Sequence, residues 1–550
     1  MPLTLCTENP SGAANQNFRL NMGSRVPLAT TTPRDEPMTP PAFLQIHDVP
    51  AWWAAHTPEA VALMDDNSRL SYRQLQRAID DAAAALAGLG VARGHRVLLV
   101  AENSMALVVF VFAVSRLGAQ FVLVNARLSA EEIDAIAAHA QAGAEIYIGA
   151  GFKEGEVHAL RRGATSLGCG LPERVRAAVR AQAPEAEPGC DDVAALIYTA
   201  GTTGRPKGVM LTHAGLLFVA TTLGALRRMS ASDRSYGVLP MSHTMGLTSV
   251  LLSTLAAGGS VLVRARFDVE ALVEAIETRE LTLFQGVQAM HMALLSHLRR
   301  HDRTLQRGRL RYIYAGGSPL DPTLKDQVQT LFGLPLHNGY GMTESSPTIC
   351  HSRFGERRAD TSVGPPIPGV DIRIVNAGGK DVAAGDSGEL WVRGPGLMRG
   401  YFRDCAATRA AIQDGWLRTG DVARRDAEGN VFLVARIKDI IIRSGFNVYP
   451  AEVEAALNAH PSVAQSAVVG REVESNEEVI AFVQLRAGHA LDSAALQDFM
   501  KERISSYKRP SQIVFLDTLP VMANGKVQRT ALKAMATDLS SKQPPSFNSR

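Results

Sequence analysis

The front half of the chain alternates two hydrophobic patterns. Ser71 and Gln74 are spaced as a helix-capping box, and the apolar residues that follow recur at helical spacing as far as Leu86. A short, continuously apolar run follows at 96–100, a helical run at 105–116 and a second short run at 120–124. Strand and helix patterns in alternation predict a mostly parallel sheet with helices on both faces. The same alternation returns from Leu196 through Val263 to Tyr340.

The most apolar stretch runs from Met105 to Val124 and is about as long as a membrane-spanning helix. Arg116 and Gln120 interrupt it, with Gly118 between them. A span needs about 20 nearly uncharged residues. We therefore predict a buried helix followed by a buried strand, and no transmembrane segment.

The pattern changes after Gly364, where three prolines and the short apolar runs 370–375 and 388–392 indicate a β-rich subdomain. A compact tail follows Ala435. Its expected strands lie near 439–443, 463–469 and 479–485, and its expected helices near 450–457 and 493–504. The predicted fold class is α/β. It has a large N-terminal domain of layered, mostly parallel sheets with helices and a β-rich subdomain, and a small, mobile α+β C-terminal domain.

Composition narrows the classes of function. The 550 residues are 46% hydrophobic and 20% charged, with a net charge of +3, which gives no reason to expect nucleic acid as the main partner. Five scattered cysteines without a CxxC pair argue against a disulfide scaffold or a zinc site and favour a reducing compartment, so we expect a cytoplasmic protein. Residues 1–41 lack the apolar core of a signal peptide and read as a disordered extension, so Met22 or Met38 could be the start in place of Met1.

The strongest chemical signal is the run Tyr198-Thr-Ala-Gly-Thr-Thr-Gly-Arg-Pro-Lys207-Gly-Val, between an apolar strand at 194–197 and a helix expected near Thr212. Glycines let backbone approach a ligand closely, threonines offer donors, and lysine adds a positive charge, which together suit a polyphosphate. It is not a GxxxxGK[ST] loop, because Gly208 follows the lysine. The candidate phosphate ligands are Thr199, Gly201, Thr202, Thr203, Gly204 and Lys207.

This run resembles the phosphate-binding signature of the adenylate-forming superfamily, which includes acyl-CoA synthetases, adenylation domains of peptide synthetases and beetle luciferases. The resemblance covers residues 45–535, with motifs in the family order. The family usually has Ser where this chain has Ala200. Three threonines remain in the loop, so we expect activity to survive. The resemblance implies ATP, Mg²⁺ and coenzyme A as co-substrates and cofactors.

A second motif, Asn338-Gly-Tyr-Gly-Met-Thr-Glu344, combines close-approach glycines with a flat ring and a hard oxygen ligand suited to Mg²⁺ beside phosphates. The resemblance implies that its first residues line the adenine, while Thr343 and Glu344 serve the triphosphate and the metal. The upstream run Ala315-Gly-Gly-Ser-Pro319 resembles the family's adenine-pocket turn. The nucleotide residues expected from both runs are Gly316, Gly317, Ser318, Asn338, Gly339, Tyr340, Gly341 and Thr343.

Three later motifs complete the family pattern. Asp421 would accept both ribose hydroxyls, Arg436 would contact the ribose or phosphate, and Lys438 would be the hinge. The loop around Gly445 would line the pantetheine tunnel, and Lys526 would bridge the substrate carboxylate and the α-phosphate as the catalytic cation. The expected division is 1–41 extension, 42–435 AMP-binding domain, 436–438 hinge, 439–535 lid domain and 536–550 flexible tail.

Two segments resemble walls of the family's acyl site. The first, Pro240-Met-Ser-His243-Thr-Met-Gly246, places His243 at the gate to the carboxylate, with a satisfied core histidine as the alternative. Residues 238–250 contain no Asp or Glu to pair a substrate ammonium, which disfavours α-amino acids. The second wall, Phe284 to His291, has Gly286-Val-Gln288 where relatives often have Val-Pro-Thr.

The resulting hypothesis is an ATP-dependent carboxylate–CoA ligase that forms an acyl-adenylate and then an acyl-CoA thioester, from a fatty or an aryl or alicyclic acid. The catalytic residues would be Thr343, Glu344, His243 and Lys526. Three alternatives stay open: an acyl-AMP ligase that loads a carrier-protein thiol, an oxygenase of the luciferase kind, and a non-catalytic nucleotide-binding homologue. A homodimer is also left open.

Overall fold

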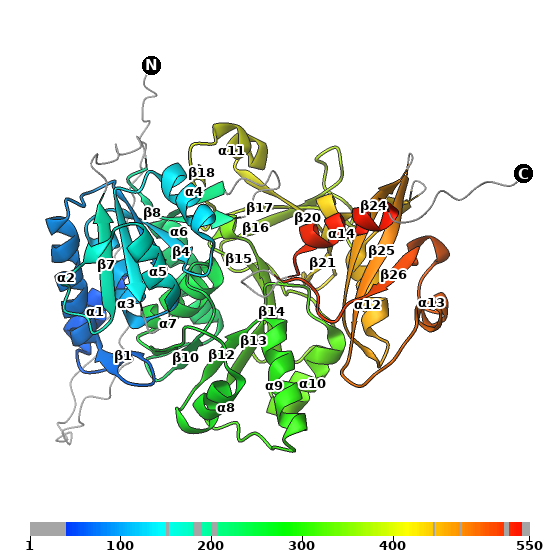
Figure 1. Cartoon of the computed structure of the whole chain (residues 1–550), viewed down its shortest axis with the longest axis horizontal. Helices are drawn as coiled ribbons and strands as arrows, with labels where there is room; N and C mark the ends of the chain where they lie inside the picture. The colour runs from blue at the N-terminus through cyan, green and yellow to red at the C-terminus, as the bar shows by residue number, and fades with distance from the viewer. Residues whose placement is uncertain are drawn as a thin grey trace, which may run out of the picture. The chain divides into compact units, whose positions relative to one another are not determined.

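A computed structural model describes residues 40–149, 153–179, 190–199, 207–443, 446–473, 476–521 and 527–541. Most of the predicted N-terminal extension lies outside these ranges. Two eight-stranded sheets form the large domain (Figure 1). The first sheet runs, in spatial order, β15 (Thr348–His351), β14 (Leu336–Gly341), β13 (Tyr312–Ala315), β12 (Leu283–Gly286), β10 (Arg234–Gly237), β11 (Ser260–Val263), β1 (Val61–Met64) and β2 (Arg69–Ser71).

The second sheet contains the strands predicted at 96–100 and 120–124. Its spatial order is β18 (Gly400–Tyr401), β9 (Lys207–Thr212), β8 (Val193–Thr199), β4 (Gln120–Asn125), β3 (Arg96–Ala101), β5 (Ala144–Gly149), β7 (Arg174–Val179) and β6 (Thr165–Ser166). The central strands of both sheets pair in parallel, whereas the edge strands are antiparallel. The mostly parallel sheets are therefore confirmed.

Side chains that alternate along β3 and β4 point into two different cores. Leu99 and Phe121 join the core between the two sheets, whereas Leu98 and Val122 join the core on the outer face. Between the sheets lie α1 (Asp48–His56), α2 (Tyr72–Gly88), α3 (Met105–Arg116), α6 (His213–Leu226), the π-helix η1 (Met245–Leu252) and α7 (Ser253–Ala256). The outer faces carry α4 (Ala130–Ala140) and α5 (Lys153–Arg161) on one sheet, and α8 (Val269–Thr278), α9 (Gln288–Arg300) and α10 (Pro322–Phe332) on the other.

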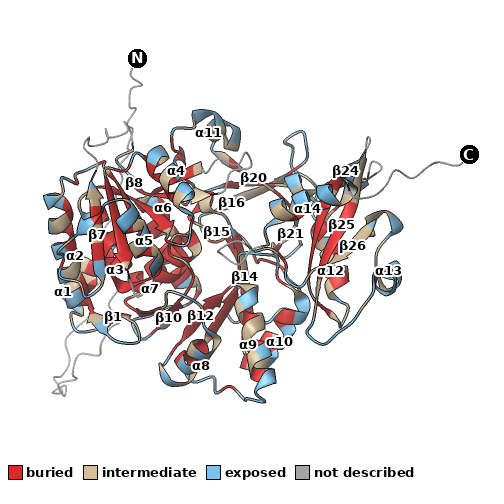
Figure 2. Ribbon diagram, viewed as in Figure 1, coloured by how far each residue is buried: buried red, intermediate tan, exposed pale blue. Residues whose placement is uncertain are grey.

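Local sequence signals fix several of these helices. Ser71 and Gln74 form the predicted capping box at the start of α2, and α3 has the predicted bounds. The twelve residues of α3 are almost wholly buried, and no helix in the described ranges is long and apolar enough to cross a membrane. Figure 2 shows the same burial along β10, β12 and β14.

The predicted β-rich region forms a sheet of β16 (Asp371–Val375), β17 (Gly388–Arg393), β20 (Trp416–Arg425), β19 (Ile412–Gln413) and β21 (Val431–Arg436), with α11 (Cys405–Ala411) beside it. The C-terminal α+β domain contains η3 (Ile437–Asp439), β22 (Ile441–Arg443), β23 (Phe446–Val448), α12 (Pro450–Asn458), β24 (Val463–Val473), β25 (Asn476–Leu485), α13 (Ser493–Lys501), η4 (Ser506–Lys508), β26 (Gln512–Phe515) and α14 (Arg529–Ser541).

Two C-terminal boundaries differ from prediction. The strand expected from Asp439 begins at Ile441, because Ile437–Asp439 forms a 3₁₀ turn that ends with the Ile440 N–H bonded to the Ile437 carbonyl. A flexible tail is expected from residue 536, but α14 continues to Ser541. Ala536 is fully buried on α14, in a core that includes Leu532 and Phe482, so apolar packing extends the helix into the predicted tail.

A buried ion pair ties three elements of the first sheet together. Asp233 precedes β10, and its carboxylate accepts hydrogen bonds from Arg311 (2.6 Å) before β13 and from Thr282 (2.8 Å) before β12. Burial alone would raise the pKa of Asp233, but these hydrogen bonds hold it below its usual value. Its carboxylate therefore stabilises the fold at neutral pH, and this contribution falls as the pH drops through the folded-state pKa.

We expect Asp233→Asn to lower the free energy of unfolding by about 3 kcal/mol at neutral pH, because the Arg311 guanidinium loses its charged partner. Urea unfolding measures the change. The difference in unfolding free energy between variant and wild type should become smaller in acid. Asp371→Asn is the matched control, since Asp371 pairs with Arg393 at an exposed site, where about 0.5 kcal/mol is typical. Equal losses in both variants would contradict the assignment.

Candidate active site

Three predicted motifs meet at one edge of the first sheet. The parallel register pairs Gly286 on β12 with Ala315 on β13, and Ala315 with Asn338 on β14. The carboxyl ends of parallel strands are where α/β sheets bind ligands. The turn after Ala315 and the strand from Asn338 therefore lie side by side, as an adenine site built from both would require.

Two glycines at this edge flank the buried ring of Tyr314. A Cβ atom added to Gly316 would lie 2.6 Å from a ring carbon of Tyr314, and one added to Gly339 would lie 2.7 Å from its hydroxyl oxygen. Any side chain at either position would displace the ring or the strand. Gly317 takes a positive φ of 87°, and both Gly317 and Ser318 are exposed at the edge.

Gln288, the first residue of α9, fastens the turn that carries Ser318. Its Nε2 donates to the Ser318 Oγ at 2.8 Å and to the Pro319 carbonyl, and its Oε1 accepts from the Asp321 N–H at 2.8 Å. The glutamine that departs from the family pattern thus binds the predicted nucleotide turn. No local pattern predicts this contact, because the partners lie 30 or more residues apart.

Asn338 and Tyr340 are both buried on β14. The Asn338 amide donates to the carbonyls of Thr361 and Ser362 at 3.2 and 3.3 Å, so it holds neighbouring backbone in place. Tyr340 is only 7% exposed, and its hydroxyl donates to the Asp421 carboxylate. Burial and the Asp421 charge hold the pKa of Tyr340 well above its usual value, so this hydroxyl remains a donor.

Asp421 also pairs with Arg436 across neighbouring strands. The register of β20 and β21 places the two residues opposite each other, with the Arg436 Nε 2.9 Å from the Asp421 Oδ1. The carboxylate is buried, whereas half of the Arg436 side chain is exposed. The structure thus brings together Tyr340, Asp421 and Arg436, three residues predicted to contact the nucleoside.

Lys207 lies on a strand that the sequence analysis did not anticipate. It pairs with Thr199 across the antiparallel hairpin of β8 and β9, and the helix capped by Thr212 begins only at His213. The helix near Thr212 is confirmed, but a strand separates it from the loop. The positive charge at the described end of this loop therefore comes from the lysine side chain rather than from a helix N-terminus.

Tyr401 joins Lys207 to Glu344. The Lys207 Nζ lies 4.8 Å from the centroid of the Tyr401 ring, whose hydroxyl donates to the Glu344 Oε1 at 2.9 Å. Glu344 is buried in η2 (Thr343–Ser345), and its carbonyl accepts from the Met398 N–H. Burial and the Glu344 charge raise the pKa of Tyr401, so it stays protonated. Tyr401 lies outside the predicted motifs, because its position depends on β18 pairing with β9.

His243 is half-buried in the turn before η1. The His243 backbone N–H donates to the Pro240 carbonyl at 3.0 Å, and the His243 carbonyl accepts from the Leu247 N–H. The segment before it is held by Asn103, whose amide donates to the Gly237 and Leu239 carbonyls and accepts from the Met241 N–H. Asn103 is a second positioning residue that lies outside the predicted motifs.

The remaining predicted residues lie in the hinge segment or outside the described residues. Lys438 is exposed in η3, between β21 and β22, and its hinge role stays a prediction. Gly201, Thr202, Thr203, Gly204, Gly445 and Lys526, together with Ala200, lie outside the described residues. On either side of Lys526, Val521 and Val527 form an antiparallel bridge, and Arg529 pairs with the partly buried Glu454 at 2.8 Å.

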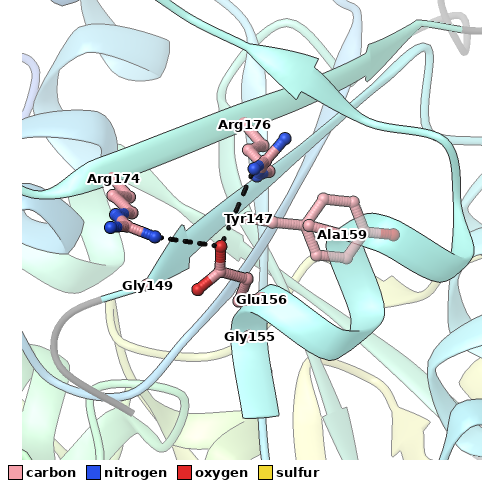
Figure 3. Close-up of a pocket in the computed structure, with 7 residues that line it drawn as sticks. All are labelled: Tyr147, Gly149, Gly155, Glu156, Ala159, Arg174 and Arg176. Atoms are coloured by element: carbon pink, nitrogen blue, oxygen red, sulfur yellow. Dashed lines mark hydrogen bonds and ion pairs between the residues drawn. The ribbon is translucent and has the colours of Figure 1, made fainter. Parts of the chain in front are cut away.

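A separate pocket lies on the second sheet, where α5 covers β5 and β7. Figure 3 shows the Glu156 carboxylate directed at Arg174 and Arg176, with nitrogen–oxygen distances of 3.4 and 3.7 Å. One carboxylate therefore pairs with two guanidinium groups. None of the predicted site residues lines this pocket, so it is not the candidate active site.

Comparison with known proteins identifies the family. Residues 50–402 match the AMP-binding enzyme family, and residues 452–526 match the AMP-binding enzyme C-terminal domain. The chain belongs to the AMP-binding enzyme family. It is similar to the feruloyl-CoA synthase of Amycolatopsis sp, with 34% identity over 86% of this chain and 95% of the relative. It is also 34% identical to the indoleacetate–CoA ligase of Aromatoleum aromaticum, over 87% of this chain and 95% of that protein.

Solved structures agree with this membership. The o-succinylbenzoate CoA synthetase of Bacillus subtilis, in complex with its acyl-adenylate intermediate, superposes with a TM-score of 0.75 at 29% identity, covering 88% of this chain and 97% of that chain. ATP-bound MatB from Rhodopseudomonas palustris gives 0.78 at 28% identity, covering 90% and 99%. The AMP-binding protein is thus an AMP-forming acid–thiol ligase of the acyl-CoA synthetase branch, and the predicted superfamily, fold class and enzyme class are confirmed.

We expect Tyr401→Phe to weaken binding of Mg·ATP about tenfold, because one hydrogen bond to a charged carboxylate contributes roughly 1.5 kcal/mol. The ring beside Lys207 would remain. Isothermal titration calorimetry measures the change. Tyr147→Phe is the matched control, since the Tyr147 hydroxyl donates at 2.7 Å to the buried Glu145, away from the predicted site. Unchanged affinity in Tyr401→Phe would contradict a role for this bond.

Proposed function

We propose that this ligase activates an aryl or alicyclic carboxylic acid as its acyl-adenylate, with ATP, and then transfers the acyl group to coenzyme A. The observation that carries the proposal is the convergence of two groups of side chains around β14. Tyr340, Asp421 and Arg436 form one group, and Lys207, Tyr401 and Glu344 form the other. The first suits a nucleoside with vicinal hydroxyls, and the second suits a polyphosphate with a bound cation.

Two observations support the class of acid. Similar proteins are named for feruloyl, indoleacetate and 2-succinylbenzoate substrates, all of which carry rings. Residues 238–250, the predicted acyl wall, contain no Asp or Glu. A substrate ammonium would be left unpaired against that wall, so an α-amino acid fits poorly.

In the first step, a carboxylate oxygen of the acid attacks the α-phosphorus of ATP. The new oxygen–phosphorus bond forms as the bond to the β-phosphate bridging oxygen breaks, and pyrophosphate leaves. Lys526 would neutralise the charge that accumulates between the carboxylate and the α-phosphate, while Lys207 and Thr199 would hold the leaving phosphates. Such charges stabilise the transition state more than the ground state.

Glu344 is the proposed ligand of Mg²⁺. A single carboxylate suits this ion, which protein sites hold through one or two carboxylates together with substrate phosphates. Within the described ranges, no group of three His, Cys, Asp or Glu side chains is placed to hold a metal. When bound, the ion would neutralise charge on the phosphates, and the Tyr401 hydroxyl would orient the carboxylate that faces it.

In the second step, the thiol sulfur of coenzyme A attacks the acyl carbonyl carbon. The bond from that carbon to the AMP oxygen breaks, AMP leaves, and the thiol proton passes to solvent. We propose that the C-terminal domain rotates about Lys438 between the steps. Lys526 would then withdraw, and the loop with Gly445 would approach the thiol's path. A hinge of this kind needs only a few residues that change backbone angles.

The direct test is ATP–pyrophosphate exchange across a panel of aryl, alicyclic, fatty and α-amino acids, followed by assay for thioester with coenzyme A or a carrier protein. We expect exchange with ring-bearing acids and thioester formation with coenzyme A. Thioester only on the carrier protein would support the acyl-AMP ligase alternative. Absence of exchange with every acid would identify a non-catalytic nucleotide-binding homologue and overturn the proposal.

We expect Lys526→Ala to slow adenylation at least 100-fold, within the range for loss of one transition-state charge contact, while thioester formation from supplied acyl-adenylate stays within about threefold of wild type. Single-turnover assays of the two half-reactions measure this separation. Lys533→Ala, at an exposed position on α14, is the control. Equal loss in both half-reactions would assign Lys526 a different role.

A further inference from the structure

A guanidinium is buried against Ser249, whose hydroxyl contacts Gln285 in one predicted wall of the acyl site. Arg227 follows α6 and is only 1% exposed. Its Nη1 and Nη2 donate to the carbonyl and hydroxyl of Ser249 on η1, at 2.6 and 2.8 Å, whereas its Nε has no hydrogen-bond partner. Burial of a charge is unfavourable unless it is paired and hydrogen-bonded. In the described ranges, no carboxylate forms an ion pair with Arg227; Asp233, in the same region, is bonded to Arg311 and Thr282.

Two aromatic rings stabilise the positive charge of the Arg227 guanidinium. The guanidinium carbon lies 5.5 and 5.7 Å from the ring centroids of Tyr312 and Tyr314, within the range of a cation–π contact. Such contacts stabilise the positive charge through the ring faces. They do not satisfy the Nε–H, which still requires an oxygen acceptor.

A second buried donor near Arg227 also lacks a partner. The Ser249 hydroxyl donates to the Gln285 Oε1 at 3.1 Å, and the Gln285 Nε2 is unpaired in a side chain that is 1% exposed. A buried donor left without a hydrogen-bond partner is unfavourable. Two such groups around one serine leave hydrogen-bonding capacity for an oxygen from a water or from another molecule.

The position of the pair connects it to the proposed reaction. Ser249 lies on η1, which follows the turn that contains His243, and Gln285 immediately precedes Gly286 at the carboxyl end of β12. Tyr314, beside the guanidinium, is the ring flanked by Gly316 and Gly339. Arg227 and Gln285 therefore lie behind the predicted site, on the acyl side. A π-helix such as η1 is a frequent feature of functional sites.

We propose that Arg227 and Gln285 form a specificity subsite for a hydrogen-bond-accepting oxygen on the acyl group, remote from the carboxylate that reacts. A ring carbonyl, a phenolic oxygen and a second carboxylate share this chemistry. The inference rests on the proposed function and deepens it, because it selects oxygenated ring acids over their hydrocarbon analogues. Sites built around a substrate oxygen reject analogues that lack it, since the buried donors are then left unpaired.

The test uses the full-length enzyme and pairs of acids that differ only in the remote oxygen. The pairs are 3-phenylpropanoate with its 4-hydroxy analogue, 3-cyclohexylpropanoate with its 4-oxo analogue, and 2-butylbenzoate with 2-(3-carboxypropyl)benzoate. Pyrophosphate-exchange kcat/KM is measured for each. We expect at least one oxygenated member to be preferred about 30-fold or more. The pair that shows the preference identifies which oxygen the subsite takes.

Arg227→Met and Gln285→Leu should each reduce that preference to within about threefold, a loss expected when the donor is removed. Arg228→Met is the matched control, because the neighbouring arginine is exposed, and it should keep the wild-type ratio. Thermal unfolding verifies that each variant is folded. If Arg227→Met does not fold, Gln285→Leu and Ser249→Ala decide the question, since each removes a different part of the same donor group.

Three results would overturn the inference. Equal kcat/KM within every pair in the wild type would show that a buried water or the rings alone satisfy Arg227. An unchanged preference in the folded variants would place the discriminating group elsewhere. Absence of exchange with every acid in the wild type would remove the proposed function, and the inference with it. The first two results leave the proposed function standing, which distinguishes the two failures.

Discussion

The parallel register of β12, β13 and β14 is the constraint on which the candidate site depends. Parallel strands end at a common edge, and the pairing of Gly286, Ala315 and Asn338 aligns three segments that are far apart in the chain. A slip of one residue would turn the side chains of a strand to its opposite face and break this alignment. The buried pair of Asp233 and Arg311 ties together segments that lead into this part of the sheet.

The polar side chains at the edge are held by partners within the protein. Tyr340 and Arg436 both bind the Asp421 carboxylate, and the Tyr401 hydroxyl binds Glu344. Each carboxylate therefore has its position set before any nucleotide arrives. Groups that need little rearrangement on binding stabilise developing charge more effectively than mobile groups do. The β-rich sheet thus contributes to the site through β20 and β21, as well as covering the core.

The acyl side of the molecule contrasts with this arrangement. Asp233 is a buried charge with its partners complete, whereas Arg227 retains a free Nε–H among aromatic rings. The two residues lie in one stretch of chain, between α6 and β10. A buried charge with all its hydrogen bonds made stabilises the fold. A buried charge with a free donor can still bind an acceptor on another molecule. This difference separates the structural charge from the one proposed to recognise substrate.

The sequence by itself determined the local elements and the chemistry of the motifs. The capping box at Ser71 and the apolar run of α3 depend on residues a few positions apart, so their patterns predict them directly. The glycine-rich motifs likewise identified the family and the residues at Asn338 and Asp421. Only the tertiary structure decided which side chains position these motifs. Tyr401 reaches Glu344 across 57 residues, and Asn103 reaches Met241 across 138. No local periodicity encodes such contacts, because strand pairing and packing bring the partners together.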